Sequence, residues 1–203
     1  MCYTEAEKGG RDVKIWDITR ELLSSPPYPG DPPPALHTLS HTAYGDAFTV
    51  SELHCCTHAG THLDAPLHCF PDGEDVASLA PECLVGECTV MSFDGILLGD
   101  EAERLLPRLS APRLLLRGRA ELSGSAAFVL AGAGLQLLGV ESASAASATA
   151  ETAVHRELLG AGVLLLENLD LSQVPDGRYF LFAAPLKLAG AEAAPVRAFL
   201  IGR

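Results

Sequence analysis

The chain has 203 residues, which suits one domain, and 48% of them are hydrophobic while 20% are charged. This balance excludes wholesale disorder, because it supplies enough apolar surface to form a core. Asp and Glu outnumber Lys and Arg by 26 to 14, so the formal net charge is −12. Phosphate backbones and anionic lipid surfaces repel such a chain, so neither a nucleic acid nor a membrane is an expected partner.

The N-terminal segment 1–11 is polar, and we expect it to be a frayed tail of a single domain that spans 1–203. Acidic residues stand where a signal peptide would need an apolar stretch, which predicts a cytoplasmic protein. The most apolar stretch, 126–140, is too short to span a bilayer. In that compartment the six cysteines are expected to be free thiols.

Apolar periodicity and turn residues predict a strand-rich chain in which helices appear late. Strands are predicted at 13–19, 36–42, 48–57, 84–93, 113–117, 138–141, 163–167, 178–186 and 195–201. Helices are predicted at 100–106, 125–138 and 151–159, the first with Asp100 as N-cap and Glu103 completing a capping box. Prolines make 26–34 a stiff loop, and 142–149 is a second loop. This order predicts a mixed, β-rich α/β domain.

Three of the seven histidines fall within residues 58–68, which read HAGTHLDAPLH. The glycine and proline favour a folded-back loop that points several side chains at one spot. Imidazole and carboxylate are natural ligands of zinc, manganese and iron, so His58, His62 and Asp64 form a compact ligand set. The two oxygens of Asp64 could bridge two metals. The stretch is not a zincin helix, because Ala59 follows His58 where that motif needs glutamate.

Other interpretations use the neighbouring cysteines. A structural zinc site could combine Cys55 and Cys56 with His58 and His62, but adjacent residues of an extended chain point to opposite faces and chelate one metal poorly. A cysteine nucleophile, Cys56 or Cys69, lacks both a flanking signature and an environment that would lower its pKa.

Two residues far along the chain could complete a metal site. His155 lies in a predicted helix, and Glu167 closes an apolar strand, where an acid is costly unless it is paired or bound to metal. The alternatives are that His155 faces solvent and that Glu167 pairs with Arg156.

The stretch 58–68 resembles, without a break, the His-x-Gly-Thr-His-x-Asp-x-Pro-x-His hallmark of the cyclase-like metal-dependent hydrolases. This family includes bacterial kynurenine formamidases (arylformamidases) and isatin hydrolases. Similarity extends to WDIT at 16–19, YPGD at 28–31, HR at 155–156, ENL at 167–169, APLKL at 184–188 and APVRA at 194–198. One segment departs, since the family's Gly-x-Asp-x-x-Ser-x-Asp reads GVESASAA at 139–146, with Glu141 and Ala146 at the acidic positions.

The resemblance implies an α/β fold of the swivelling β/β/α type and a homo-oligomer, either a dimer or a tetramer. It implies two divalent metal ions, zinc or manganese, held by a shared set of side chains. The first metal would be bound by His58, His62 and Asp64, and the second by Asp64, His155 and Glu167. His68 would be the catalytic acid/base.

The implied activity is hydrolysis of a small-molecule amide, first of all N-formyl-L-kynurenine to L-kynurenine and formate in tryptophan catabolism. His68 would protonate the departing arylamine nitrogen, which leaves poorly as an anion. Tyr28, in the stiff proline loop, would form an aromatic wall for the substrate, and Trp16 or Phe48 could add to it. The alternatives are another cyclic or linear amide such as isatin, or a metal-stabilised binding protein without turnover.

Overall fold

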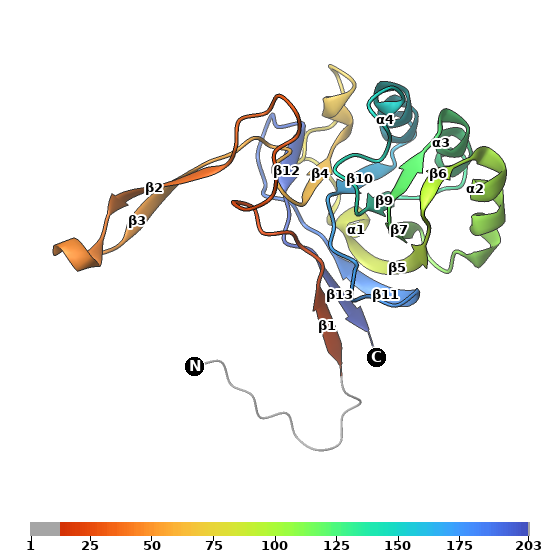
Figure 1. Ribbon diagram of the computed structural model, residues 1–203. Coiled ribbons are helices and arrows are strands. Elements are labelled where there is room, and N and C mark those ends of the chain that lie inside the picture. The colour runs from red at the N-terminus through yellow and green to blue at the C-terminus, as the bar shows by residue number, and fades with distance from the viewer. Residues whose placement is uncertain (1–12, 203) are drawn as a thin grey trace.

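The computed structural model describes residues 13–202, and its largest unit of secondary structure is a long curved sheet with helices packed against it (Figure 1). The strands of this sheet are β1 (Lys14–Asp17), β4 (His62–Asp64), β5 (Val85–Ser92), β7 (Arg113–Arg117), β9 (Leu137–Val140), β10 (Leu164–Glu167), β11 (Gly177–Phe182), β12 (Ala193–Pro195) and β13 (Phe199–Gly202). A separate hairpin consists of β2 (Ala35–Ser40) and β3 (Val50–His54), and a short parallel pair of β6 (Gly95–Leu97) and β8 (Ala120–Leu122). The helices are α1 (Pro81–Leu84), α2 (Gly99–Leu105), α3 (Gly124–Ala131) and α4 (Glu151–Gly160).

The strand order in the large sheet is β1-β13-β11-β5-β7-β9-β10-β4-β12. The central strands β5, β7, β9 and β10 run parallel, and the strands outside them pair antiparallel. Buried parallel strands read as unbroken apolar runs, as the sequences RLLLR of β7 and LLLE of β10 do. Helices α2, α3 and α4 cover one face of this sheet and enclose a core that includes Leu116, Leu130 and Leu158.

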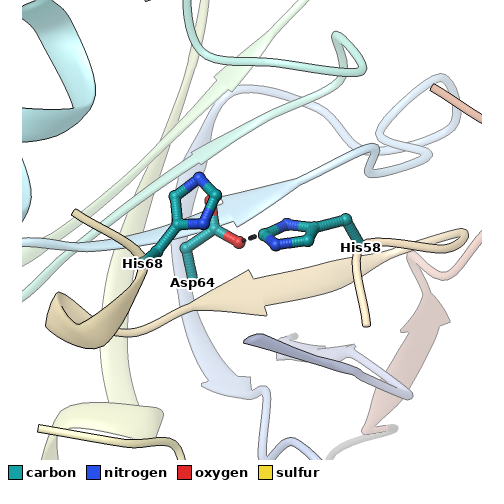
Figure 2. A group of neighbouring side chains, drawn as sticks. All are labelled: His58, Asp64 and His68. Atoms are coloured by element: carbon teal, nitrogen blue, oxygen red, sulfur yellow. Dashed lines mark ion pairs between the residues drawn. The ribbon is translucent and has the colours of Figure 1, made fainter. Parts of the chain in front are cut away.

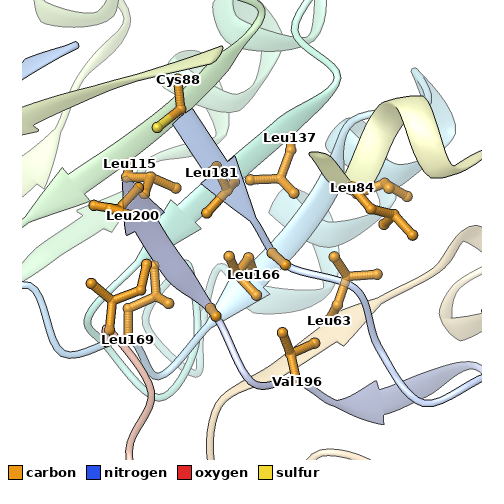
Figure 3. Packing of buried hydrophobic residues seen from close by; sticks show 14 of the residues in the cluster. Leu63, Leu84, Cys88, Leu115, Leu137, Leu166, Leu169, Leu181, Val196 and Leu200 are labelled. Atoms are coloured by element: carbon orange, nitrogen blue, oxygen red, sulfur yellow. The ribbon is translucent and has the colours of Figure 1, made fainter. Parts of the chain in front are cut away.

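The opposite face of the sheet curls around another apolar core, where strands from both of its ends meet (Figure 3). Leu63 of β4 and Leu166 of β10 pack in one cluster with Leu181 of β11 and Leu200 of β13, and all four side chains are fully buried. This packing fixes β4 against the end of β10, which is where the candidate ligands lie.

The predicted mixed, strand-rich α/β architecture is confirmed. The helix expected at 151–159 is α4, and the strand expected at 163–167 is β10. The proline segment 26–34 is a loop, and the strands expected at 36–42 and 48–57 form the hairpin, whose connection includes Gly45. The single domain over 1–203 stays a prediction, and the tail expected to fray, 1–11, lies outside the described residues.

Within residues 13–202, no helix has both the length and the apolar character that crossing a membrane requires.

Two predicted elements have the wrong extent. The helix expected at 125–138 ends at Ala131 as α3, because Gly132 and Gly134 follow, and Gly134 adopts a φ of 73° that a helix cannot continue. The strand expected at 195–201 is two strands, β12 and β13, which pair at opposite ends of the sheet. Local sequence could not show this break, since it depends on partners far along the chain.

The N-terminus of α2 differs from its predicted cap. The N-cap residue is Leu98, so Asp100 lies inside the helix. The backbone N–H of Leu98 donates to the carboxylate of Glu101 at 2.9 Å, which gives Glu101 the role predicted for Glu103.

Candidate metal centre

Strand β4 places two candidate ligands on one face of the sheet. His62 and Asp64 point to the same face, while Leu63 between them enters the apolar core. Glu167 lies directly opposite His62 in the antiparallel pair of β4 and β10, so its side chain shares that face. The folded-back loop predicted for 58–68 is therefore wrong at its centre, which is a strand because β10 and β12, far along the chain, pair with it.

The turn before β4 is tied to the ligand strands by the threonine of the hallmark. Thr61 Oγ1 donates to the carbonyl oxygen of Asn168 at 2.7 Å and accepts from the backbone N–H of Arg20 at 2.9 Å. Asn168, directly after Glu167, has a φ of 60°, in the left-handed region that asparagine tolerates better than most residues. Gly60 has a φ of 63° in this turn, so the hallmark needs a glycine there for its left-handed backbone conformation.

Helix α4 supplies the remaining histidine on this face. His155 is buried, and its Nε2 lies 3.2 Å from Glu167 Oε1. Glu167 Oε1 also accepts from the backbone N–H of Ala145 at 2.7 Å. The alternative pairing of Glu167 with Arg156 is wrong, because the Arg156 guanidinium donates to the carbonyl of Cys69.

The Asp64 carboxylate is the centre of the cluster. Its side chain is 1% exposed, and neither oxygen accepts a hydrogen bond from any residue in the described range 13–202. Imidazole nitrogens surround it: His58 Nδ1 lies 3.0 Å from Oδ1, His62 Nε2 3.5 Å from Oδ1, and His155 Nε2 3.6 Å from Oδ2. Figure 2 shows His58 and His68 on either side of this carboxylate.

This donor set fits divalent metal ions. A buried carboxylate without hydrogen bonds is costly unless a cation compensates its charge, and neighbouring imidazole and carboxylate groups are the ligands of zinc and manganese. Within the described residues, two groups have ligand atoms close enough to share an ion, and Asp64 belongs to both. They are His58 with Asp64 and His68, and His62 with Asp64 and Glu167. The family resemblance implies a different grouping. In it, His62 binds the same metal ion as His58, and His155 binds the same metal ion as Glu167.

The carboxylates also change the pKa of the buried histidines. Burial alone would lower the pKa of His62, but Asp64 and Glu167 raise it to about 9. Burial would likewise lower the pKa of His155, but Glu167 and Asp64 raise it to about 9. Burial would raise the pKa of Glu167, but His155 and His62 lower it to about 2. Without metal, the cluster is thus held together as ion pairs.

A cavity of about 220 Å³ opens directly over this cluster. Its wall consists of the six residues proposed as ligands or acid/base together with Tyr28, Asp31, Ala143 and Glu151. The Tyr28 hydroxyl donates to Glu151 Oε2 at 2.8 Å, which fixes the ring at the wall. The rings of His68 and His58 have centroids 4.5 Å apart, and partial desolvation at the cavity wall lowers the pKa of His68.

The structure thus brings together all of the side chains that the resemblance implies as ligands, acid/base or aromatic wall, whereas the alternative zinc ligands Cys55 and Cys56 do not line the cavity. Trp16 packs against Tyr179 with ring centroids 5.2 Å apart, and Phe48 lies 76% exposed near the end of the hairpin, so neither lines the cavity. Sequence reasoning missed Asp31, Glu151 and the bridging role of Thr61. The position of Thr61 inside the histidine motif could have indicated that its hydroxyl has a structural role at the site.

Comparisons with known proteins identify the family of this chain. The Cyclase family model, described as "Putative cyclase", matches residues 15–105. A kynurenine formamidase of Sphingopyxis alaskensis is 33% identical over 203 residues, which cover 92% of this chain and 97% of that protein. The chain belongs to the cyclase family of metal-dependent hydrolases. A second relative, the kynurenine formamidase of Maricaulis maris, is 34% identical over 206 residues, which cover 93% of this chain and 98% of that protein.

Solved structures show the same fold. A protein named as a metal-dependent hydrolase from Bacillus stearothermophilus superposes with a TM-score of 0.80 at 29% identity, over 95% of this chain and all of that one (100%). An isatin hydrolase bound to thioisatinate superposes with a TM-score of 0.79 at 19% identity, over 94% of this chain and 92% of that one. The second likeness shows the fold alone.

The first prediction tests whether the Asp64 carboxylate holds metal. Asp64→Asn should lose most of its bound metal, because an amide nitrogen has no lone pair to offer and the side chain carries no charge. Metal per chain would be measured by elemental analysis after dialysis, with Asp100→Asn, an exposed change on α2, as the matched control. Wild-type metal content in Asp64→Asn would contradict a bridging role.

The second prediction concerns the metal-free protein. The pKa of His62 and His155 is raised from 6.5 to about 9, so their pairing stabilises the fold fully below pH 6.5 and is lost as pH rises through 9. The free energy of unfolding, measured by urea denaturation with a chelator present, should fall by roughly 1–3 kcal/mol between pH 6.5 and 9. His155→Gln should flatten this slope and the exposed His54→Gln should keep it; a flat wild-type profile would contradict the ion-paired cluster.

Proposed function

We propose that this chain is a metal-dependent amide hydrolase that converts N-formyl-L-kynurenine to L-kynurenine and formate. The observation that carries the proposal is the buried Asp64 carboxylate, which accepts no hydrogen bond from residues 13–202 and is ringed by imidazole nitrogens at the floor of a cavity. Kynurenine formamidases at 33% and 34% identity, aligned over nearly their whole length, support the substrate.

Two divalent ions, zinc or manganese, are the proposed cofactors. His58, His62 and Asp64 would hold one ion, and Asp64, His155 and Glu167 the other. Bound there, such ions act as Lewis acids and lower the pKa of a water molecule to near neutrality. The mixed nitrogen and oxygen donors suit both metals.

His68 is the proposed acid/base. It is exposed at the cavity while the histidines beside it are buried or half-buried, so its ring can reach a substrate that enters from solvent. An imidazole can take up and return a proton near neutral pH, and the arylamine nitrogen needs that proton to leave. Tyr28 is the proposed substrate wall, because its ring is held over the cavity through Glu151.

The divergent segment 139–146 contacts the cavity at only one described position. Glu141 accepts hydrogen bonds from the backbone N–H groups of Gly118 at 2.6 Å and Leu171 at 2.7 Å, so its carboxylate is committed to the fold. Ala146 is 5% exposed and belongs to the core under the helices. Ala143 alone of this segment lines the cavity. Isatin remains the second candidate substrate, because the hallmark that 58–68 resembles is shared by isatin hydrolases.

The third prediction tests the reaction directly. Purified protein should hydrolyse N-formyl-L-kynurenine, lose this activity on treatment with a chelator and regain it with zinc or manganese. Isatin, assayed in parallel, should turn over more slowly per unit of enzyme. Stoichiometric metal without turnover of either amide would contradict the proposal and favour a binding protein.

The same assay assigns the acid/base. His68→Ala should keep its metal and lose about 10²-fold or more in kcat, the usual contribution of a positioned proton donor. His41→Ala, on the hairpin, is the matched histidine control and should behave as the wild type. Wild-type turnover in His68→Ala would remove this residue from the mechanism.

We also propose that the protein acts as a homo-oligomer, in which the β2–β3 hairpin packs on a second copy. The hairpin projects away from the sheet (Figure 1), and every residue from 35 to 54 is exposed or half-buried. Leu36 pairs with Leu53 on one of its faces, with exposed fractions of 54% and 47%. An isolated two-stranded hairpin is marginal in water, so a covered apolar face would explain its order.

The same chain also carries an uncovered apolar sheet face. Ile15 of β1 and Phe180 of β11 lie on either side of Ile201 of β13 in the strand register, and they are 62% and 44% exposed. Either surface would be covered if it packed on a second copy. The described thiols, Cys55, Cys56, Cys69, Cys83 and Cys88, are all free, which supports the cytoplasmic location that belongs to this proposal.

The fourth prediction tests this assembly. Light scattering after size exclusion should give a dimer or tetramer for the wild type and a smaller species for Leu53→Lys, because a buried lysine would be unpaired. Glu52→Lys, on the opposite face of the same strand, is the matched control and should keep the wild-type mass. A monomeric wild type would contradict the proposal.

A further inference from the structure

Two of the candidate histidine ligands are oriented by backbone carbonyls. The Nε2 atoms of His62 and His155 face the buried carboxylates. Their outer nitrogens lie close to carbonyl oxygens: His62 Nδ1 is 3.0 Å from that of Gly60, and His155 Nδ1 is 2.9 Å from that of Glu151. A ring nitrogen that donates its proton outward leaves the lone pair of the other nitrogen directed inward, which is how proteins commonly fix a metal-binding histidine.

His58 has the opposite ring orientation, with its Nδ1 facing the buried carboxylate, and its outer nitrogen faces a side chain instead of a backbone carbonyl. Its Nδ1 faces Asp64 at 3.0 Å, and its Nε2 lies 3.4 Å from Glu192 Oε1. Glu192 therefore occupies for His58 the place that backbone carbonyls occupy for the other two rings. His58 is also the most exposed of the three rings, with 19% of its side chain accessible against 4% for His62 and His155. Packing constrains it least, so its orientation depends most on a partner.

Glu192 is itself fixed at this position from both the backbone and the side chain. Its carbonyl accepts from the backbone N–H of Ala65 at 2.8 Å, and the next residue, Ala193, pairs with Asp64 between β12 and β4. Its carboxylate accepts from the Thr57 hydroxyl at 2.6 Å. Thr57 directly precedes His58, so the carboxylate is anchored beside the ring that it faces.

We infer that Glu192 is a positioning residue of the metal centre, which accepts a hydrogen bond from the His58 Nε2–H and leaves the Nδ1 lone pair free to bind metal. The inference rests on the metal centre proposed above. It makes the segment between Leu188 and β12 part of the site, although the sequence there, AGAE, carries no recognised ligand. Glu192 acts through His58, so it need not touch the substrate.

The test is zinc affinity, measured by competition with a chromophoric chelator at fixed pH. Glu192→Gln should weaken zinc binding about 10- to 100-fold, the usual effect of removing the outer partner of a histidine ligand. Glu52→Gln is the matched control, because Glu52 Oε1 lies 3.1 Å from His54 Nε2 in an exposed pair on the hairpin. An affinity of Glu192→Gln within twofold of the wild type, or an equal loss in Glu52→Gln, would overturn the inference.

A second readout separates positioning from a structural role. The thermal midpoint of the chelator-treated protein should be nearly the same for Glu192→Gln and the wild type, while the d–d spectrum of the cobalt-loaded form should change. Thr57→Val, which removes the anchor and keeps the carboxylate, should weaken zinc binding by a smaller factor, and it provides the test if Glu192→Gln does not fold. Unchanged affinity in Thr57→Val together with Glu192→Gln would overturn the inference. Lack of amide turnover by the wild type would count against the proposed function alone, since none of these measurements uses a substrate.

Discussion

The structure depends on one buried charge, the Asp64 carboxylate. Removing an ionised carboxylate from water costs several kcal/mol unless opposite charge compensates it, and no described donor within 13–202 hydrogen-bonds to either of its oxygens. Three imidazole nitrogens within 3.6 Å replace those donors. In the metal-free protein His62 and His155 carry compensating protons, because the neighbouring carboxylates raise the pKa of each to about 9. When metal cations bind and compensate the carboxylate charge instead, the same rings become neutral ligands. The same arrangement of side chains therefore stabilises the metal-free protein and binds the metal.

The pleat of the sheet separates this polar cluster from the core that supports it. Along β10, Leu164 and Leu166 point into the curled side of the sheet, whereas Leu165 and Glu167 point to the side covered by the helices. Glu167 is thus the last residue on the face that α4 packs against, and His155 of α4 reaches it from there. A shift of one residue in the pairing of β4 with β10 would exchange ligands for leucines, so the core packing on the other face also protects the register of the site.

The sequence predicted the ligand types well and their arrangement less well. The spacing within 58–68 indicates His58, His62 and Asp64 because they are close along the chain, and the resemblance adds His155 and Glu167. It did not predict that β4 is a strand, since its partners Leu165 and Ala193 lie far away. For the same reason the chain from 195 to 201 could not be divided between two ends of one sheet. Tertiary pairing decides both features, and short-range patterns do not record it.

Glu151 joins the metal centre to the wall of the cavity. Its backbone carbonyl lies 2.9 Å from His155 Nδ1, and its carboxylate accepts from the Tyr28 hydroxyl at 2.8 Å. One residue in the first turn of α4 therefore orients a candidate ligand through its main chain and the aromatic wall through its side chain. The proline loop that carries Tyr28 is stiff, which limits how far the ring can move relative to the ligands. The distance between the candidate metal centre and the Tyr28 ring is consequently a property of the scaffold. Under the proposed function, substrates would be selected by whether an aryl ring and its amide fit that fixed distance.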